Sequence, residues 1–226
     1  MNESGLQLMQ RLDAAYREGT GLSDRRYYSM FYVVPARSDF LMLNANPGGS
    51  PDNFHIVNVA GGQHEYIEGA NSGRTTRNGA ELLRYLVGTR DPEGIRHVQV
   101  SNISFRRSPD KSRLGLPFSR AVQEAEPFVR ELLIFIQPKA ILFAGDKNLH
   151  AFARAHGAGI KSFPEESLFG PNGTHEACYF ARYLLDIPYL NEVDAYTIFH
   201  PSKMNSYFRA KVLPVLGERL REFVAP

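Results

Sequence analysis

Three short polar segments, each at or near the end of an apolar run, hold the residues best suited to chemistry. Asn46 lies just after the run 40–44, Asn102 lies in the second half of the run 97–105, and His200 follows the run 194–199. The amide oxygen of an asparagine can accept a hydrogen bond from water, and an imidazole can donate one near neutral pH. Because an amide is not a base, this set indicates a site that positions water and stabilises charge.

The elements that would position these residues alternate along the chain. Alternation or continuous apolar character predicts strands at 40–44, 97–105, 138–145 and 194–199, and helical spacing predicts helices at 77–87, 119–137, 146–155 and 206–223. We expect Pro127 to kink or divide its helix, and 179–185 fits either a strand or a helix. This order predicts a single α/β domain over 1–226, with three αβα layers and a mainly parallel sheet of about four strands. Ligands of such sheets bind beyond the carboxyl ends of the strands.

Composition excludes several kinds of site and location. The one cysteine, Cys178, excludes a disulfide framework, a four-cysteine zinc site and a cysteine-ligated iron–sulfur cluster. The histidines have no nearby partner ligands, so we expect neither a metal nor a cofactor. No apolar run approaches the roughly 18 residues of a membrane span, and 1–20 has the spacing of an amphipathic helix rather than a signal peptide. We therefore expect no membrane contact and a cytoplasmic location.

Positive charge is concentrated although the net charge is only +2. Such clusters can follow a phosphate backbone, but they are more often a solvated face of the protein. Alone they would not identify a nucleic-acid enzyme. The clustered residues are Arg106, Arg107, Lys111, Arg113 and Arg120, with Arg74 and Arg77 in a second polar stretch.

Four motifs, in order over residues 40–210, resemble those of the uracil-DNA glycosylase superfamily. Asn44-Ala-Asn-Pro-Gly48 is similar to the Gly-x-Asn-Pro-Gly loop of its mismatch-specific and single-strand-selective branches, and His200-Pro-Ser-Lys-Met-Asn205 is similar to its closing motif. Ser101-Asn102 and the strand 138–145 match two segments between them. The resemblance implies a uracil-DNA glycosylase-like fold and a monomeric, monofunctional DNA N-glycosylase. Such an enzyme hydrolyses the N-glycosidic bond of a flipped-out pyrimidine and leaves an abasic site.

The resemblance also implies roles for individual residues. Asn46 would position the water, and a neutral His200 would donate to the pyrimidine O2 while the base leaves as an anion. Asn102 would read the O4/N3 edge of uracil or, with its amide flipped, the N4/N3 edge of cytosine. Met204 stands where relatives carry an apolar wedge. The other expected substrate contacts are Asn44, Pro47, Gly48, Gly49, Phe54 and Tyr66, and the other expected DNA contacts are Ser50, Arg106, Arg107, Gly145, Lys147, Ser202 and Lys203.

One departure from the superfamily widens the range of substrates. Strict uracil enzymes have Asp-Pro-Tyr in the first motif, and that tyrosine closes off the pyrimidine C5 position. This sequence has Asn46-Pro47-Gly48, so the barrier is absent. We therefore expect a 5-modified pyrimidine at least as readily as uracil. A hypermodified cytosine in phage DNA is such a base, which makes antiviral defence an alternative to DNA repair.

Other interpretations of the same residues remain open. Taken singly, Asn46 is more often a turn asparagine and His200 a capping histidine. For Asn102 a buried, backbone-bonded asparagine is nearly as frequent as the functional role, and for Met204 ordinary packing and the wedge are about equally frequent. The pocket of the same fold would also suit a nucleoside or nucleotide hydrolase, or a module that binds modified DNA without cutting it. The segment 51–78 matches nothing recognisable, and we expect it to shape the pocket over the base.

Overall fold

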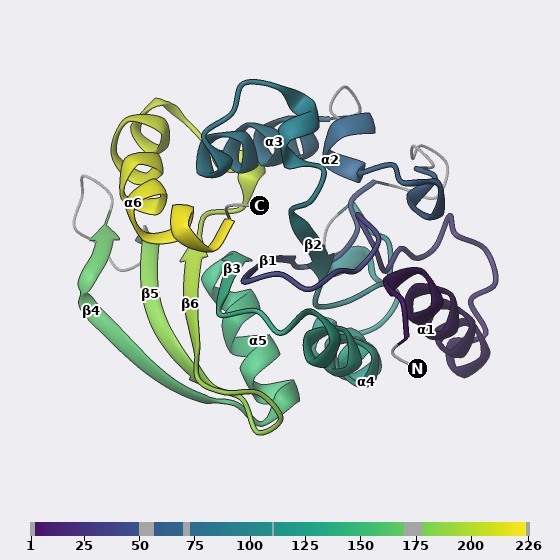
Figure 1. Ribbon diagram of the computed structural model, residues 1–226. Coiled ribbons are helices and arrows are strands. Elements are labelled where there is room, and N and C mark those ends of the chain that lie inside the picture. Colours follow the sequence, from purple (N-terminus) through teal and green to yellow (C-terminus); the bar gives the residue numbers. More distant parts are fainter. Residues whose placement is uncertain (1–2, 50–56, 70–72, 110, 170–177, 225–226) are drawn as a thin grey trace.

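A six-stranded sheet runs through the protein (Figure 1), whose computed structural model describes residues 3–49, 57–69, 73–109, 111–169 and 178–224. The strands are β1 Phe40–Asn44, β2 Gln99–Asn102, β3 Ala140–Ala144, β4 Gly159–Phe169, β5 Cys178–Asp186 and β6 Val193–Ile198. Their order is β2-β1-β3-β6-β5-β4; the first four are parallel, and β5 is antiparallel to both its neighbours. The predicted α/β class with a mainly parallel sheet is confirmed, whereas the expected number of about four strands is wrong.

The two additional strands, β4 and β5, lie at one edge of the sheet. Most residues of β4 are exposed, including Lys161 and Glu165, because this strand has only one neighbour. Its pairing with β5 is also shifted between Phe163 and Leu168. An exposed, irregular edge strand lacks the regular apolar alternation from which strands are predicted, which explains why β4 was not expected. The ambiguous segment 179–185 is part of strand β5.

Helices connect the strands and cover the sheet. Pro127 lies within a helix that continues from Phe118 to Ile136, so this proline does not divide the helix. The lost backbone hydrogen bond is offset by the buried face of this helix, which includes Val129, Leu132 and Leu133. None of the helices in the described ranges has the length and apolar character needed to cross a membrane. The helices are α1 Gly5–Thr20, α2 Glu65–Glu68, α3 Arg74–Val87, α4 Phe118–Ile136, α5 Asp146–His156 and α6 Leu213–Val224, with a π-helical turn at Phe208–Val212 and short 3-10 turns at Val59–Gly61, Pro92–Ile95, Lys111–Arg113 and Pro201–Lys203.

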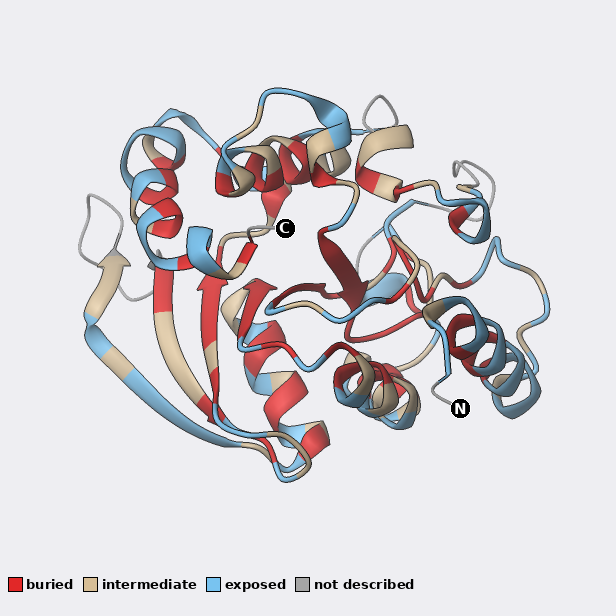
Figure 2. Ribbon diagram, in the orientation of Figure 1, coloured by how far each residue is buried: buried red, intermediate tan, exposed pale blue. Residues whose placement is uncertain are grey.

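The central strands are buried on both faces, as the three-layer prediction requires. Leu41 and Phe143 belong to the apolar cluster that contains the inward faces of α1, α4 and α5. Met42 and Leu142, one residue along on the same strands, belong to the cluster formed with α3 and α6. Figure 2 shows the buried residues concentrated in these strands and on the helix faces that meet them. This double burial accounts for the continuous apolar runs in β1 and β3.

Parallel pairing sends the loops after β1, β2 and β6 to the same edge of the sheet. Asn44 at the end of β1 is paired in register with Asn102 at the end of β2. The pairing continues beyond the strands, because the N–H groups of Ile103 and Ser104 donate to the carbonyls of Asn44 and Ala45 at 2.9 and 3.0 Å. The loop that carries Asn46 is therefore held against the segment that follows β2.

Gly79 on α3 allows the ring of Tyr66 to pack closely against that helix, so the absence of a side chain at this position should contribute to stability. A Cβ at this position would lie 2.7 Å from Cζ of the buried Tyr66 ring. We expect Gly79→Ala to lower the free energy of unfolding by about 1–3 kcal/mol, despite the better helix propensity of alanine. Gly19→Ala in α1 is the matched control: no atom lies within 4 Å of its added Cβ, so stability should stay unchanged or rise. Urea denaturation measures both, and a Gly79→Ala variant as stable as the parent protein would contradict this packing.

Candidate active site

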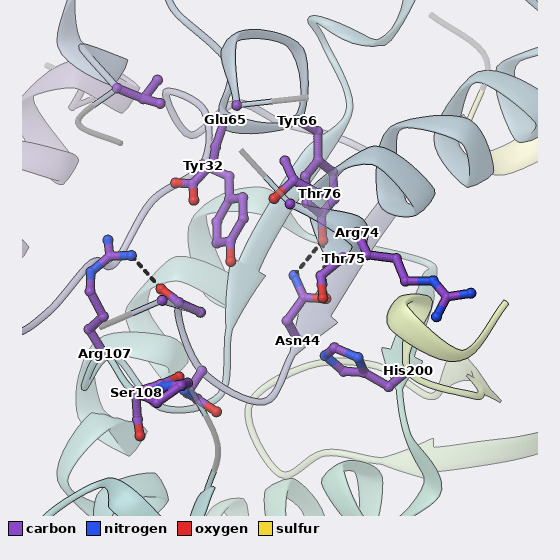
Figure 3. Close-up of a pocket in the computed structure, with 17 residues that line it drawn as sticks. Tyr32, Asn44, Glu65, Tyr66, Arg74, Thr75, Thr76, Arg107, Ser108 and His200 are labelled. Atoms are coloured by element: carbon purple, nitrogen blue, oxygen red, sulfur yellow. Dashed lines mark hydrogen bonds between the residues drawn. The ribbon is translucent and has the colours of Figure 1, made fainter. Parts of the chain in front are cut away.

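A cavity of about 460 Å³ opens beyond the carboxyl ends of β1 and β6 (Figure 3). Its walls come from the loops after these two strands, from α2, from the start of α3 and from residues 107–109 after β2. About half of the lining residues belong to the described parts of the segment 51–78, which the sequence predicts to shape the pocket. Seven residues predicted from the sequence line the cavity together: Asn44, Asn46, Gly48, Gly49, Tyr66, Arg107 and His200.

Backbone carbonyls determine which end of the Asn46 amide is available in the pocket. Its Nδ2 donates to the carbonyl of Pro47 at 2.9 Å and to that of Ser108 at 3.0 Å. Because a carbonyl oxygen can only accept, both contacts require the nitrogen at this position, and the amide orientation follows. Pro47 also accepts from the N–H of Ser108 at 3.0 Å. The Oδ1 atom receives no hydrogen bond from the described residues, so it remains an acceptor for a bound molecule.

The ring of His200 is oriented by the turn that follows it. Nδ1 accepts the backbone N–H of Ser202 at 3.3 Å and lies 2.8 Å from the Ser202 hydroxyl oxygen. A backbone N–H can only donate, so Nδ1 is unprotonated and Nε2 carries the proton of the neutral ring. His200 thus caps the turn Pro201–Lys203 with one nitrogen and keeps the other as a donor. Figure 3 shows the ring extending from its backbone toward Asn44.

Burial and neighbouring positive charges keep His200 neutral. Desolvation is the larger cause that lowers the pKa of its imidazole below the usual 6.5, and the charges of Lys111 and Lys203 add to it. The backbone of this segment is also tied to α3, because the buried amide of Asn78 donates to the carbonyl of Pro201 at 2.6 Å. The pocket therefore contains a fixed acceptor at Asn46 and a fixed neutral donor at His200.

Two tyrosines form the inner wall, and one of them separates Asn102 from the cavity. The rings of Tyr32 and Tyr66 meet edge to face with centroids 5.3 Å apart. The Tyr66 hydroxyl is 3.0 Å from Nδ2 of Asn44, whereas the Tyr32 hydroxyl donates to Oδ1 of Asn102 at 3.3 Å. Asn102 is fully buried and does not line the cavity, so the prediction that it reads the base directly is wrong for this structure. It orients the Tyr32 hydroxyl instead.

A carboxyl group in the pocket was not expected from the sequence. Glu65 begins α2, lines the cavity, and has its pKa raised to about 7 by burial, against a smaller lowering by the charge of Arg107. Arg107 in turn donates from Nη1 to the carbonyl of Gly48 at 2.6 Å. Five other residues that line the cavity were not predicted from the sequence: Tyr32, Arg74, Thr75, Thr76 and Ser108. Arg74 belongs to a positively charged stretch of the sequence. The other four lie in loops and helix starts without a recognisable motif, so a single sequence contains no signal for them.

Met204 and Arg106 both have structural roles within the protein. Met204 is 1% exposed and packs in the cluster that contains Phe208, because the turn before it directs the chain onto the face covered by α6. Arg106 forms two hydrogen bonds of 2.8 and 2.7 Å with the carboxylate of Glu124, which also accepts from the Tyr16 hydroxyl at 2.8 Å. Such a two-point ion pair fixes an arginine within the protein. The prediction that Met204 acts as a wedge is therefore wrong for this structure, whereas a contact of the partly exposed Arg106 with DNA stays a prediction.

The remaining predicted DNA contacts fall into three groups. Ser202 is hydrogen-bonded to His200, so the structure places it in support of that ring. Lys203 is exposed next to the pocket, whereas Gly145 and Lys147 lie at the start of α5 and do not line it. Ser50 falls outside the described residues, as does Phe54, which the sequence predicts as a substrate contact. No group of three or more histidine, cysteine, aspartate or glutamate side chains within the described ranges is arranged to hold a metal ion.

The assigned state of His200 can be measured without any substrate. We expect nitrogen-detected NMR of the free protein at neutral pH to show the tautomer with the proton on Nε2, because Nδ1 accepts from Ser202. The titration midpoint should lie below 6.5, because burial disfavours the charged ring. The spectrum of His200→Gln assigns the signals by their loss. A proton on Nδ1, or a midpoint above 6.5, would contradict the geometry.

The sequence matches no protein-family model, and none of the curated proteins matches it.

Proposed function

We propose that this chain is a DNA glycosylase of the uracil-DNA glycosylase superfamily. It would hydrolyse the N-glycosidic bond of a flipped-out pyrimidine, either uracil or a 5-modified base such as a hypermodified cytosine in phage DNA, and leave an abasic site. The observation that carries this proposal is that Asn46 and His200, far apart in the sequence, line one cavity with an acceptor and a donor available.

The proposed reaction uses these two groups on opposite sides of the bond. Cleavage develops positive charge on the sugar and negative charge on the departing base. Asn46 Oδ1 would accept a hydrogen bond from the attacking water and hold it under the sugar. His200 Nε2–H would donate to the pyrimidine O2, where negative charge accumulates, and its lowered pKa favours a neutral donor. An amide is too weak a base to remove much of the proton from water, so leaving-group stabilisation would supply most of the rate.

The arrangement of the motifs supports membership of the superfamily. The first motif follows β1 and the closing motif follows β6, and both loops leave the same edge of a parallel sheet ordered β2-β1-β3-β6. The strand 138–145 of the resemblance corresponds to β3, which lies between them. The resemblance in sequence therefore coincides with proximity in space at the site.

The size of the cavity supports a substituted base. About 460 Å³ is within the range of pockets that hold ligands much larger than a bare pyrimidine ring. Gly48 lines the cavity at the position where strict uracil enzymes have a tyrosine, and neither it nor its neighbour Gly49 adds a side chain to the cavity. We infer that a group on C5 of the pyrimidine can be accommodated.

Substitution of the two proposed catalytic residues tests the function. We expect the parent protein to convert an oligonucleotide containing uracil or a 5-modified cytosine into one with an alkali-labile site. Asn46→Ala and His200→Ala should each lower the single-turnover rate by about 100-fold or more, as loss of a transition-state hydrogen bond does elsewhere. His150→Ala is the matched histidine control, because its side chain is about half exposed and it does not line the cavity.

Two outcomes would replace the proposal with an alternative. Tight binding of modified DNA with no alkali-labile site would indicate a binding module. Release of bases from free nucleosides but not from oligonucleotides would indicate a nucleoside hydrolase. Full activity in both the Asn46→Ala and His200→Ala variants would refute the assigned roles.

A further inference from the structure

Glu65 presents a carboxyl group to the cavity without a hydrogen-bonding partner among the described residues. Its backbone is fixed, because its N–H donates to the carbonyl of Tyr32 at 2.9 Å and His64 caps α2 by accepting from Tyr66 at 3.1 Å. Glu68, one turn along α2, differs in forming an ion pair with Arg96 and in lying outside the cavity lining. The backbone of Glu65 is therefore fixed at the cavity wall, and its acceptor atoms are available to a bound molecule.

An ionised carboxyl group buried in this position costs free energy unless a bound molecule supplies a hydrogen-bond donor. Burial disfavours the ionised form, which is why the pKa of Glu65 is raised to about 7. The charged and titratable groups that act on this carboxyl are Arg107, Tyr32 and Tyr66. Arg107 offsets the burial only in part, and the two tyrosines are themselves buried. Strongly shifted groups of this kind concentrate at sites where a ligand completes the hydrogen bonding.

The position of Glu65 relative to His200 indicates which part of a base it would meet. Figure 3 shows Glu65 beyond Tyr32, on the side of the cavity away from His200. In a pyrimidine, O2 and the C4–C5 bond lie on opposite sides of the ring. A base whose O2 contacts His200 therefore directs its C4 and C5 substituents toward the wall that contains Glu65.

We propose that Glu65 selects bases that carry a hydrogen-bond donor on the C4–C5 side. This inference rests on the proposed glycosylase function and adds its substrate class. The donor is either the 4-amino group of a cytosine derivative or a hydroxyl on a C5 substituent. An ionised carboxylate only accepts, so it matches either donor, whereas uracil presents the acceptor O4 and is disfavoured by the same oxygens. Selection of this kind combines an attraction to the right base with a repulsion of the wrong one.

A panel of four bases in one oligonucleotide sequence tests this selection. Uracil, cytosine, 5-hydroxymethylcytosine and 5-hydroxymethyluracil are compared by single-turnover excision with the parent protein, Glu65→Gln and the matched control Glu68→Gln. We expect the parent protein to prefer donor-bearing bases over uracil. Glu65→Gln should reduce that preference by about tenfold or more, because the hydrogen bond to a charged acceptor is lost. Glu68→Gln should retain the preference.

The base preference over the panel identifies the donor group. The pH dependence of that preference tests whether the Glu65 carboxylate is the acceptor, and a separate measurement tests folding. Preference for both cytosines indicates the amino group, and preference for both hydroxymethyl bases indicates the hydroxyl. With the parent protein the preference should increase as pH rises through about 7, where Glu65 ionises, and it should not change with pH in Glu65→Gln. Thermal melting verifies that Glu65→Gln is folded.

Two results would overturn the inference. One of them leaves the proposed glycosylase function intact, and the other refutes it. Excision with the same base preference in the parent protein and in Glu65→Gln would refute the role of Glu65 and leave the glycosylase proposal intact. Release of no base at all from the panel and from the 5-modified cytosine oligonucleotide would refute the glycosylase proposal, and this inference with it.

Discussion

Parallel pairing of β1 and β6 with the strand between them is the constraint on which the site depends. β3 pairs in parallel with both, so the loops that leave β1 and β6 must emerge at the same edge, only one strand apart. Asn46 and His200 meet there although most of the chain separates them in sequence. Burial of the strands on both faces stabilises this arrangement, and the loops contribute polar groups that the core itself could not contain.

Main-chain hydrogen bonds then decide what each polar group can do. Two carbonyls hold the nitrogen of Asn46, and one N–H holds Nδ1 of His200, so the free acceptor and the free donor are determined before any ligand binds. Preorganised groups of this kind need no rearrangement when charge develops in a reaction. The pocket also contains Glu65, whose hydrogen-bonding capacity the described residues leave unused. These features together favour a polar, hydrogen-bonding ligand over an apolar one.

Much of the fold could be predicted from the sequence because the parallel core strands are continuous apolar runs and the helices have regular spacing. Asn46 and His200 could be predicted because each directly follows such a strand. β4 could not, since an exposed edge strand has no comparable pattern. The exact neighbours of a side chain were also unpredictable: Met204 is chemically suited both to a DNA contact and to packing in the core, and only the path of the chain decides between them. Glu65 lies in a segment without motifs, so its position depended entirely on tertiary structure.

Whether one base occupies the cavity between Asn46 and His200, as we propose, can be seen in a structure of a complex with DNA. The Asn46→Ala variant, in which cleavage should be slow, would be crystallised with an oligonucleotide that contains 5-hydroxymethylcytosine. We expect an extruded base in the cavity with its O2 within hydrogen-bonding distance of His200 Nε2. A base that remains stacked in the DNA, or a nucleotide bound on another face of the protein, would contradict it.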